Sequence, residues 1–195
     1  MKLATTSGDF TRFAATHKER IGHVIDAGFR YIDLSMYHDA CVDSPIMQDS
    51  WRDFAAELRA YAESRGATFV QAHSPGGNPL QKDENWQILL DSTLRSIEVC
   101  GALGIGHTVV HAGWADGIGK EEYFEKNREF YRLLLPTAEK CGVKVLTENS
   151  THANMGERYY FYTGADMKEF VEYVDHPSVW RLLGHRTRQH RRTAV

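Results

Sequence analysis

Three residues with metal-binding side chains each close a short β-rich run of this sequence. They are His73 at the end of 68–73, His111 at the end of 107–111 and Glu148 at the end of 143–148. Imidazole and carboxylate groups together suit zinc, manganese, cobalt or iron, and a carboxylate-dominated set suits manganese or magnesium. Small residues follow each run and let a ligand approach the backbone closely. The pattern therefore predicts a divalent metal site at the ends of three strands.

A purely structural interpretation of these residues stays open. A histidine at a strand end is often a hydrogen-bonded rim residue, and 10 histidines in 195 residues allow coincidence. Glu148 is harder to explain in this way, because a carboxylate there needs a cation or a hydrogen-bond donor. Trp114 lies just beyond His111 and could either stack on a sugar face or pack within its own loop. We predict that His73, Trp114 and Asn149 bind the substrate.

Long amphipathic segments alternate with the β-rich runs along the chain. The predicted helices are 13–27, 51–64, 85–103, 120–140 and 165–174, and the predicted strands are 2–6, 29–34, 68–73, 107–111 and 143–148. A glycine follows each of the first four helices, where a helix is expected to stop. The last four strands end at 34, 73, 111 and 148, with separations of 39, 38 and 37 residues. This regular alternation is typical of βα units around a parallel sheet.

The fold class is therefore α/β, and a (β/α)8 barrel of the TIM type fits the period best. A doubly wound dinucleotide-binding sheet fits less well, because residues 5–9 lack the GxGxxG spacing. A full barrel typically needs about 250 residues. We therefore expect a barrel truncated to about five βα units, with its active site at the C-terminal ends of the strands.

Composition limits the compartment and the partners. No apolar run approaches the roughly 20 residues of a membrane span, and the first 11 residues do not resemble a signal peptide. Three cysteines without CxxC spacing favour reduced thiols in the cytoplasm. The net charge of −3 divides into −8 for residues 1–180 and five arginines without any acid in 181–195. An acidic body makes nucleic acid an unlikely partner.

Several motifs resemble those of the xylose isomerase-like TIM barrel superfamily, which includes sugar phosphate isomerases and epimerases and the AP endonuclease family 2 proteins. They are IDLS at 32–35, AHSP at 72–75, VVHAGW at 109–114 and KVLTENS at 144–150, and the resemblance spans 1–179. It implies a divalent metal at the barrel mouth, with Glu148 matching the glutamate ligand of the fifth strand. His73 and His111 match metal ligands of the endonuclease IV branch, whereas in the isomerase and epimerase branch these positions usually line the substrate pocket.

The resemblance implies a sugar or sugar-phosphate isomerase or epimerase that uses manganese, magnesium, cobalt or zinc, with a small-molecule sugar as its partner. Glu148 would be both metal ligand and candidate base, and His111 would polarise substrate hydroxyls. The second interpretation is a metal-dependent DNA-repair nuclease of the endonuclease IV type, in which His73, His111 and Glu148 all bind zinc. The third is a non-catalytic barrel fragment, which could form a homo-oligomer through its open strand edges.

The last residues depart from the family pattern. The family's sixth strand normally carries a WDTGH motif, whereas 180–195 read WRLLGHRTRQHRRTAV. For one choice of codons for 182–192, reading one base later gives CWDTGHANIEG. We therefore expect residues 1–179 to be a partial barrel and 180–195 to be a basic tail produced by a frameshift. Because that tail replaces further metal ligands, we also expect this chain to be inactive through truncation.

Overall fold

The computed structural model describes residues 3–183 and shows one parallel sheet of six strands in the order β1-β2-β3-β4-β5-β6. The strands are β1 (Ala4–Thr6), β2 (Tyr31–Ser35), β3 (Thr68–His73), β4 (His107–Val109), β5 (Lys144–Glu148) and β6 (Val179–Leu182). Each strand pairs with the next one along the chain, as in a βα barrel. The α/β barrel-type fold is confirmed.

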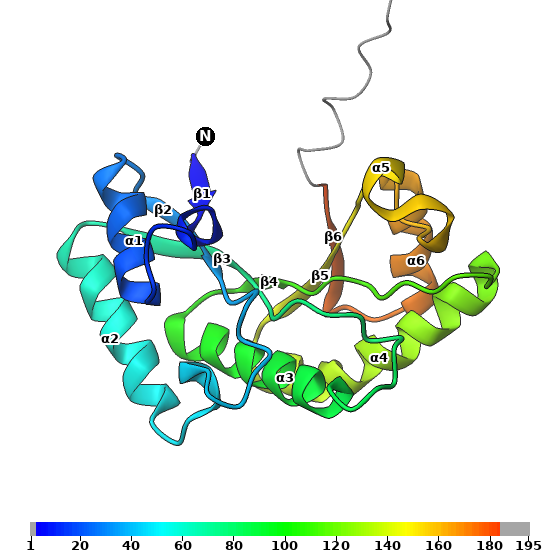
Figure 1. Ribbon diagram of the computed structural model, residues 1–195, viewed down its shortest axis with the longest axis horizontal. Coiled ribbons are helices and arrows are strands. Elements are labelled where there is room, and N and C mark those ends of the chain that lie inside the picture. Colours follow the sequence, from blue (N-terminus) through cyan, green and yellow to red (C-terminus); the bar gives the residue numbers. More distant parts are fainter. Residues whose placement is uncertain (1–2, 184–195) are drawn as a thin grey trace, which may run out of the picture.

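Helices connect successive strands and form an arc outside the sheet (Figure 1). They are α1 (His17–Asp26), α2 (Trp51–Ser64), α3 (Trp86–Leu103), α4 (Lys120–Cys141), α5 (His152–Met155) and α6 (Gly164–Val174), with short 3-10 turns at η1 (Ser7–Phe10), η2 (Pro45–Met47) and η3 (Gly156–Arg158). The expected glycine stops are present: Gly104 and Gly142 end α3 and α4 with left-handed φ angles of 73° and 66°. No helix among the described residues is both long enough and apolar enough to cross a membrane.

The first helix begins later than its apolar pattern predicts. Residues 13–16 are not helical, because Thr16 caps the helix that starts at His17. The Thr16 side chain accepts a hydrogen bond from the Glu19 backbone N–H, and the Glu19 side chain bonds the Thr16 N–H in return. This capping box satisfies the N–H groups of Thr16 and Glu19 and so fixes the start of the helix at His17.

A sixth strand lies beyond the five that the sequence predicts. β6 includes residues 180–182, which we expected to belong to the basic tail, and it pairs Val179 with Val145 and Leu182 with Glu148. Residues 184–195, which hold the other tail arginines, lie outside the described residues. Within the described chain, β1 and β6 are each paired on one side only, so the sheet has two free edges. These strands lie at opposite edges of the sheet (Figure 1).

The apolar core lies between the helices and the convex face of the sheet. Ile32, Leu34 and Val145 are fully buried on their strands, against helix residues such as Ile21 and Leu134. An aromatic cluster fills the space between α4 and α6, where Phe124, Phe161 and Phe170 stack edge to face or tilted at 4.8–5.9 Å between ring centres. This packing holds α4 in place behind the ends of β4 and β5.

Candidate metal centre

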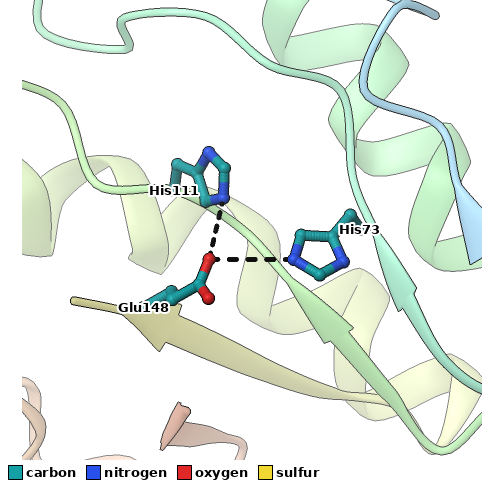
Figure 2. A group of neighbouring side chains, drawn as sticks. All are labelled: His73, His111 and Glu148. Carbon is teal, nitrogen blue, oxygen red and sulfur yellow. Dashed lines mark ion pairs between the residues drawn. The ribbon is translucent and has the colours of Figure 1, made fainter. Parts of the chain in front are cut away.

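The three candidate metal ligands meet at the C-terminal ends of three neighbouring strands. His73 is the last residue of β3, Glu148 is the last residue of β5, and His111 lies two residues beyond β4. One ligand atom from each residue lies within 4.8 Å of the other two. Glu148 Oε2 is 3.3 Å from His111 Nε2 and 3.7 Å from His73 Nε2 (Figure 2). Parallel pairing brings these ends to one edge, so residues 75 positions apart in the chain become neighbours.

The histidines and carboxylates of this cluster shift the pKa values of one another. Burial opposes protonation of His73, yet its contacts with the carboxylates of Asp33 and Glu148 raise its pKa to about 9. Burial likewise opposes ionisation of Glu148, but the two imidazoles lower its pKa to about 2. Without a metal ion, the site is therefore an ion pair at neutral pH, with Glu148 anionic and His73 cationic.

Asp33 on β2 is a member of the site that was not predicted from the sequence. Its carboxylate lies 3.0 Å from His73 Nδ1 and also accepts a hydrogen bond from Gln71 Nε2 at 2.9 Å. Because Asp33 binds one ring nitrogen, the other nitrogen of His73 points toward Glu148 (Figure 2). A carboxylate behind a ligand histidine is a common arrangement in metal sites. An acid within the apolar run 29–34 was the signal in the sequence.

The backbone around His111 is held by side chains from α4. Beyond β4 the chain leaves the sheet ladder, and its polar groups need other partners. Tyr131 donates its hydroxyl proton to the carbonyl oxygen of Val110 at 2.6 Å, and Asn127 Oδ1 accepts the N–H of Gly113 at 2.7 Å. Both side chains are fully buried. The segment that carries His111 is therefore fixed on both sides of the imidazole.

The ligand atoms fit a divalent cation by chemistry and spacing. Two ligands about 2.1 Å from a tetrahedral metal ion lie about 3.4 Å apart, close to the 3.3 and 3.7 Å measured from Glu148 Oε2. His111 Nε2 is buried and makes no hydrogen bond among the described residues. This nitrogen is therefore left to act as a ligand to a metal ion. Two imidazoles and a carboxylate suit zinc, cobalt, manganese or iron.

A cavity of about 920 Å³ opens over the three ligands. Its described lining includes the acids Asp9, Asp33 and Glu148 but no lysine or arginine. Asn149, which the sequence predicted to bind substrate, lines it together with Ser150. The wall is thus acidic and rich in hydrogen-bonding groups, which suits a cation and a polyhydroxylated ligand better than a phosphate.

Trp114 is placed differently from the other predicted substrate-binding residues, because it is not among those that line this cavity. Asn78 holds its backbone: Asn78 Oδ1 accepts the Trp114 N–H at 3.0 Å, and Asn78 Nδ2 donates to the Trp114 carbonyl at 2.8 Å. The guanidinium of Arg158 lies 5.9 Å from the centre of the indole ring. These contacts tie the loop after β4 to the loop after β3 and to η3.

The space beside Gly76 and Gly113, which follow β3 and β4, is filled by protein side chains and is not open to a ligand. A Cβ at Gly113 would lie 2.5 Å from Leu80 Cγ and 2.8 Å from Asn78 Oδ1. A Cβ at Gly76 would overlap the ring of Tyr37. We expected these positions to admit a ligand to the backbone; here they let the loops around the site pack against one another.

The comparisons with known proteins agree with this fold. Residues 21–183 match the family model of the xylose isomerase-like TIM barrel. Similar solved structures include D-psicose 3-epimerase with D-tagatose from Clostridium cellulolyticum H10 (TM-score 0.72, 20% identity, covering 100% of this chain and 67% of that one). The 3-keto-D-glucoside 4-epimerase of E. coli has a TM-score of 0.70 and 18% identity, covering 94% of this chain and 68% of that one.

A third similar structure is an AP endonuclease of family 2 from Brucella melitensis. It has a TM-score of 0.71 and 18% identity, and the match covers 100% of this chain and 73% of that one. No curated protein sequence matches the chain. The chain thus spans about two-thirds of the length of these three solved structures.

Proposed function

The chain belongs to the xylose isomerase-like TIM barrel family, and from this premise we propose that it is a sugar or sugar-phosphate isomerase or epimerase that uses a divalent metal ion. The observation that carries the proposal is the convergence of His73, His111 and Glu148 beneath an acidic cavity. The sugar epimerases among the similar structures support the substrate class.

The sequence predicted that His73 binds the substrate and that His111 polarises its hydroxyls. Because the Nε2 atoms of both rings lie close to Glu148, we instead assign both residues, together with Glu148, to the metal. A divalent ion bound there would act as a Lewis acid, holding two neighbouring oxygens of a sugar and stabilising the charge that develops when a proton leaves carbon. Glu148 is the carboxylate of this set and is unprotonated at neutral pH. We therefore assign it the task of accepting the substrate proton as well. Asn149 on the cavity wall would bind a substrate hydroxyl.

The test is metal and ketose binding by the purified chain. Manganese, magnesium, cobalt and zinc are titrated in turn, and conversion of D-tagatose is followed by carbon-13 NMR. We expect Glu148→Gln to lose the metal, whereas Glu157→Gln, whose side chain is 98% exposed on η3, retains it. Equal metal binding by the wild type and Glu148→Gln would contradict the assignment. Absence of any bound metal would favour a non-catalytic fragment.

Two expectations from the sequence stay predictions that the same assay tests. Metal binding without turnover agrees with an inactive 195-residue chain, and metal-dependent turnover contradicts that expectation. Homo-oligomer formation through the free edges of β1 and β6 is checked by the sedimentation velocity of the same sample.

A DNA-repair nuclease is the second candidate, because the ligand set of two histidines and one glutamate accompanies a fold shared with the AP endonuclease of family 2. The charge distribution opposes it: residues 1–180 carry a net charge of −8, and no lysine or arginine is among the described residues that line the cavity. Nicking of an abasic-site duplex by the zinc-loaded chain would favour this candidate over the sugar enzyme.

A further inference from the structure

We propose that Tyr37 is a sugar-binding platform on the wall of the metal-site cavity, stacking its ring on the apolar C–H face of the substrate. This inference rests on the proposed sugar chemistry and adds a binding residue to it. Tyr37 lies two residues beyond β2, lines the cavity and is 44% exposed, although most aromatic side chains among residues 3–183 are buried or half-buried. Its ring centre lies 5.8 Å from that of His111, beside the proposed metal ligands.

The ring of Tyr37 rests on Gly76. A Cβ at Gly76 would overlap the ring and lie 2.8 Å from its Cδ2 atom, so only glycine leaves the ring in this position. The Gly76 N–H donates to the Tyr37 carbonyl at 2.9 Å, which joins the loop after β2 to the loop after β3. The edge of His38 contacts the ring at 5.3 Å between centres. One face of the ring is thus supported by protein.

The backbone of Tyr37 is fixed by a buried network on either side. Met36 N donates to the His73 carbonyl at 2.8 Å, which ties the preceding residue to β3. Asp39 is buried, accepts the Ser44 hydroxyl at 2.8 Å and lies 3.1 Å from His17 Nε2 on α1. A half-exposed aromatic ring held this rigidly loses little conformational entropy on binding.

The chemistry of the ring and of the cavity points to one class of ligand. Aromatic rings in binding pockets contribute large apolar area together with a specific orientation. A sugar has polar edges for Asn149, Ser150 and a metal, and an apolar C–H face for an aromatic ring. Trp114, for which the sequence predicted the stacking role, is not among the residues that line the cavity. Tyr37 is the aromatic residue that meets the cavity beside His111.

The test uses the full-length chain with D-tagatose as the probe. The chain is loaded with manganese for isothermal titration and with diamagnetic zinc for saturation-transfer NMR with aromatic irradiation. Tyr37→Ala should raise the dissociation constant about tenfold and remove the transfer from the aromatic ring, and Tyr37→Phe should stay within about twofold of the wild type. Gly76→Ala should resemble Tyr37→Ala, because it displaces the ring while keeping the tyrosine. The matched control is Phe13→Ala, which removes an aromatic ring that is 75% exposed and does not line the cavity. It should leave the dissociation constant and the saturation transfer unchanged.

Manganese binding is measured on every variant and should be unchanged, which separates the platform from the metal site. If the wild type binds the probe and Tyr37→Ala binds it equally well, the platform is refuted while the proposed function stands. A loss confined to Trp114→Ala would also refute it and restore Trp114 to this role. If the wild type binds metal but no ketose, both the platform and the proposed sugar chemistry are wrong.

Discussion

Metal binding should release a proton from His73, and its pH dependence follows from the geometry of the site. The carboxylates of Asp33 and Glu148 raise the pKa of His73 to about 9, so about 99% of the ring is protonated at pH 7. A metal ion binds only the neutral imidazole. Binding at pH 7 should therefore release close to one proton, and the affinity should rise about 25-fold between pH 7 and 8.5.

Isothermal titration of manganese in buffers of different ionisation enthalpy measures the released proton, and chelator competition measures the affinity. In His73→Gln the slope between pH 7 and 8.5 should disappear, because the titrating ring is gone. In Asp33→Asn it should shift to lower pH, because one of the two carboxylates that favour the charged ring is lost. A wild-type affinity that does not change over this interval would refute His73 as a ligand and would return it to the substrate pocket.

Three further predictions concern stability. Tyr131→Phe leaves the buried Val110 carbonyl without its partner and should lower the free energy of unfolding by about 1–3 kcal/mol, measured by urea denaturation; an unchanged midpoint would show that the hydroxyl does not hold this segment. Gly113→Ala should lower the free energy of unfolding by about 1–3 kcal/mol, because the added Cβ overlaps neighbouring atoms. Gly106→Ala is the control, because its Cβ would lie in open space. An equal loss of stability in both variants would argue against overlap as the cause. In the metal-free chain, the stability that protonated His73 contributes is fully present below its unfolded pKa of about 6.5 and is lost as pH rises through about 9; a stability curve that stays flat there would contradict the ion-pair description.

Much of the candidate metal centre could be predicted from the sequence because strand ends are recognisable locally. A β-rich run that closes on a polar residue marks the edge of a parallel sheet, and the repeat length indicates which ends come together. His73, His111 and Glu148 follow this rule. Their meeting within 4.8 Å depends only on regular pairing of β3, β4 and β5.

Other parts of the site depend on contacts between segments that are distant in the sequence, for which local signals are weak or absent. Tyr37 follows β2 in a turn without any periodic pattern, and its position depends on the missing side chain of Gly76 in another loop. Asp33 lies inside an apolar run and becomes part of the site only through pairing of β2 with β3. β6 was not predicted because Trp180 and Arg181 are exposed and give no pattern of buried residues. The strand forms through pairing of its backbone with β5.

X-ray absorption spectroscopy of the zinc- or manganese-loaded chain tests the central claim most directly, because it reports which side chains surround the ion. We predict a first shell of nitrogen and oxygen atoms with the outer-shell scattering of two imidazole rings. In Glu148→Gln the ion should be lost, and in either His73→Gln or His111→Gln one imidazole contribution should disappear. A spectrum without imidazole scattering, or one that the three substitutions leave unchanged, would contradict the claim that β3, β4 and β5 together build a metal centre.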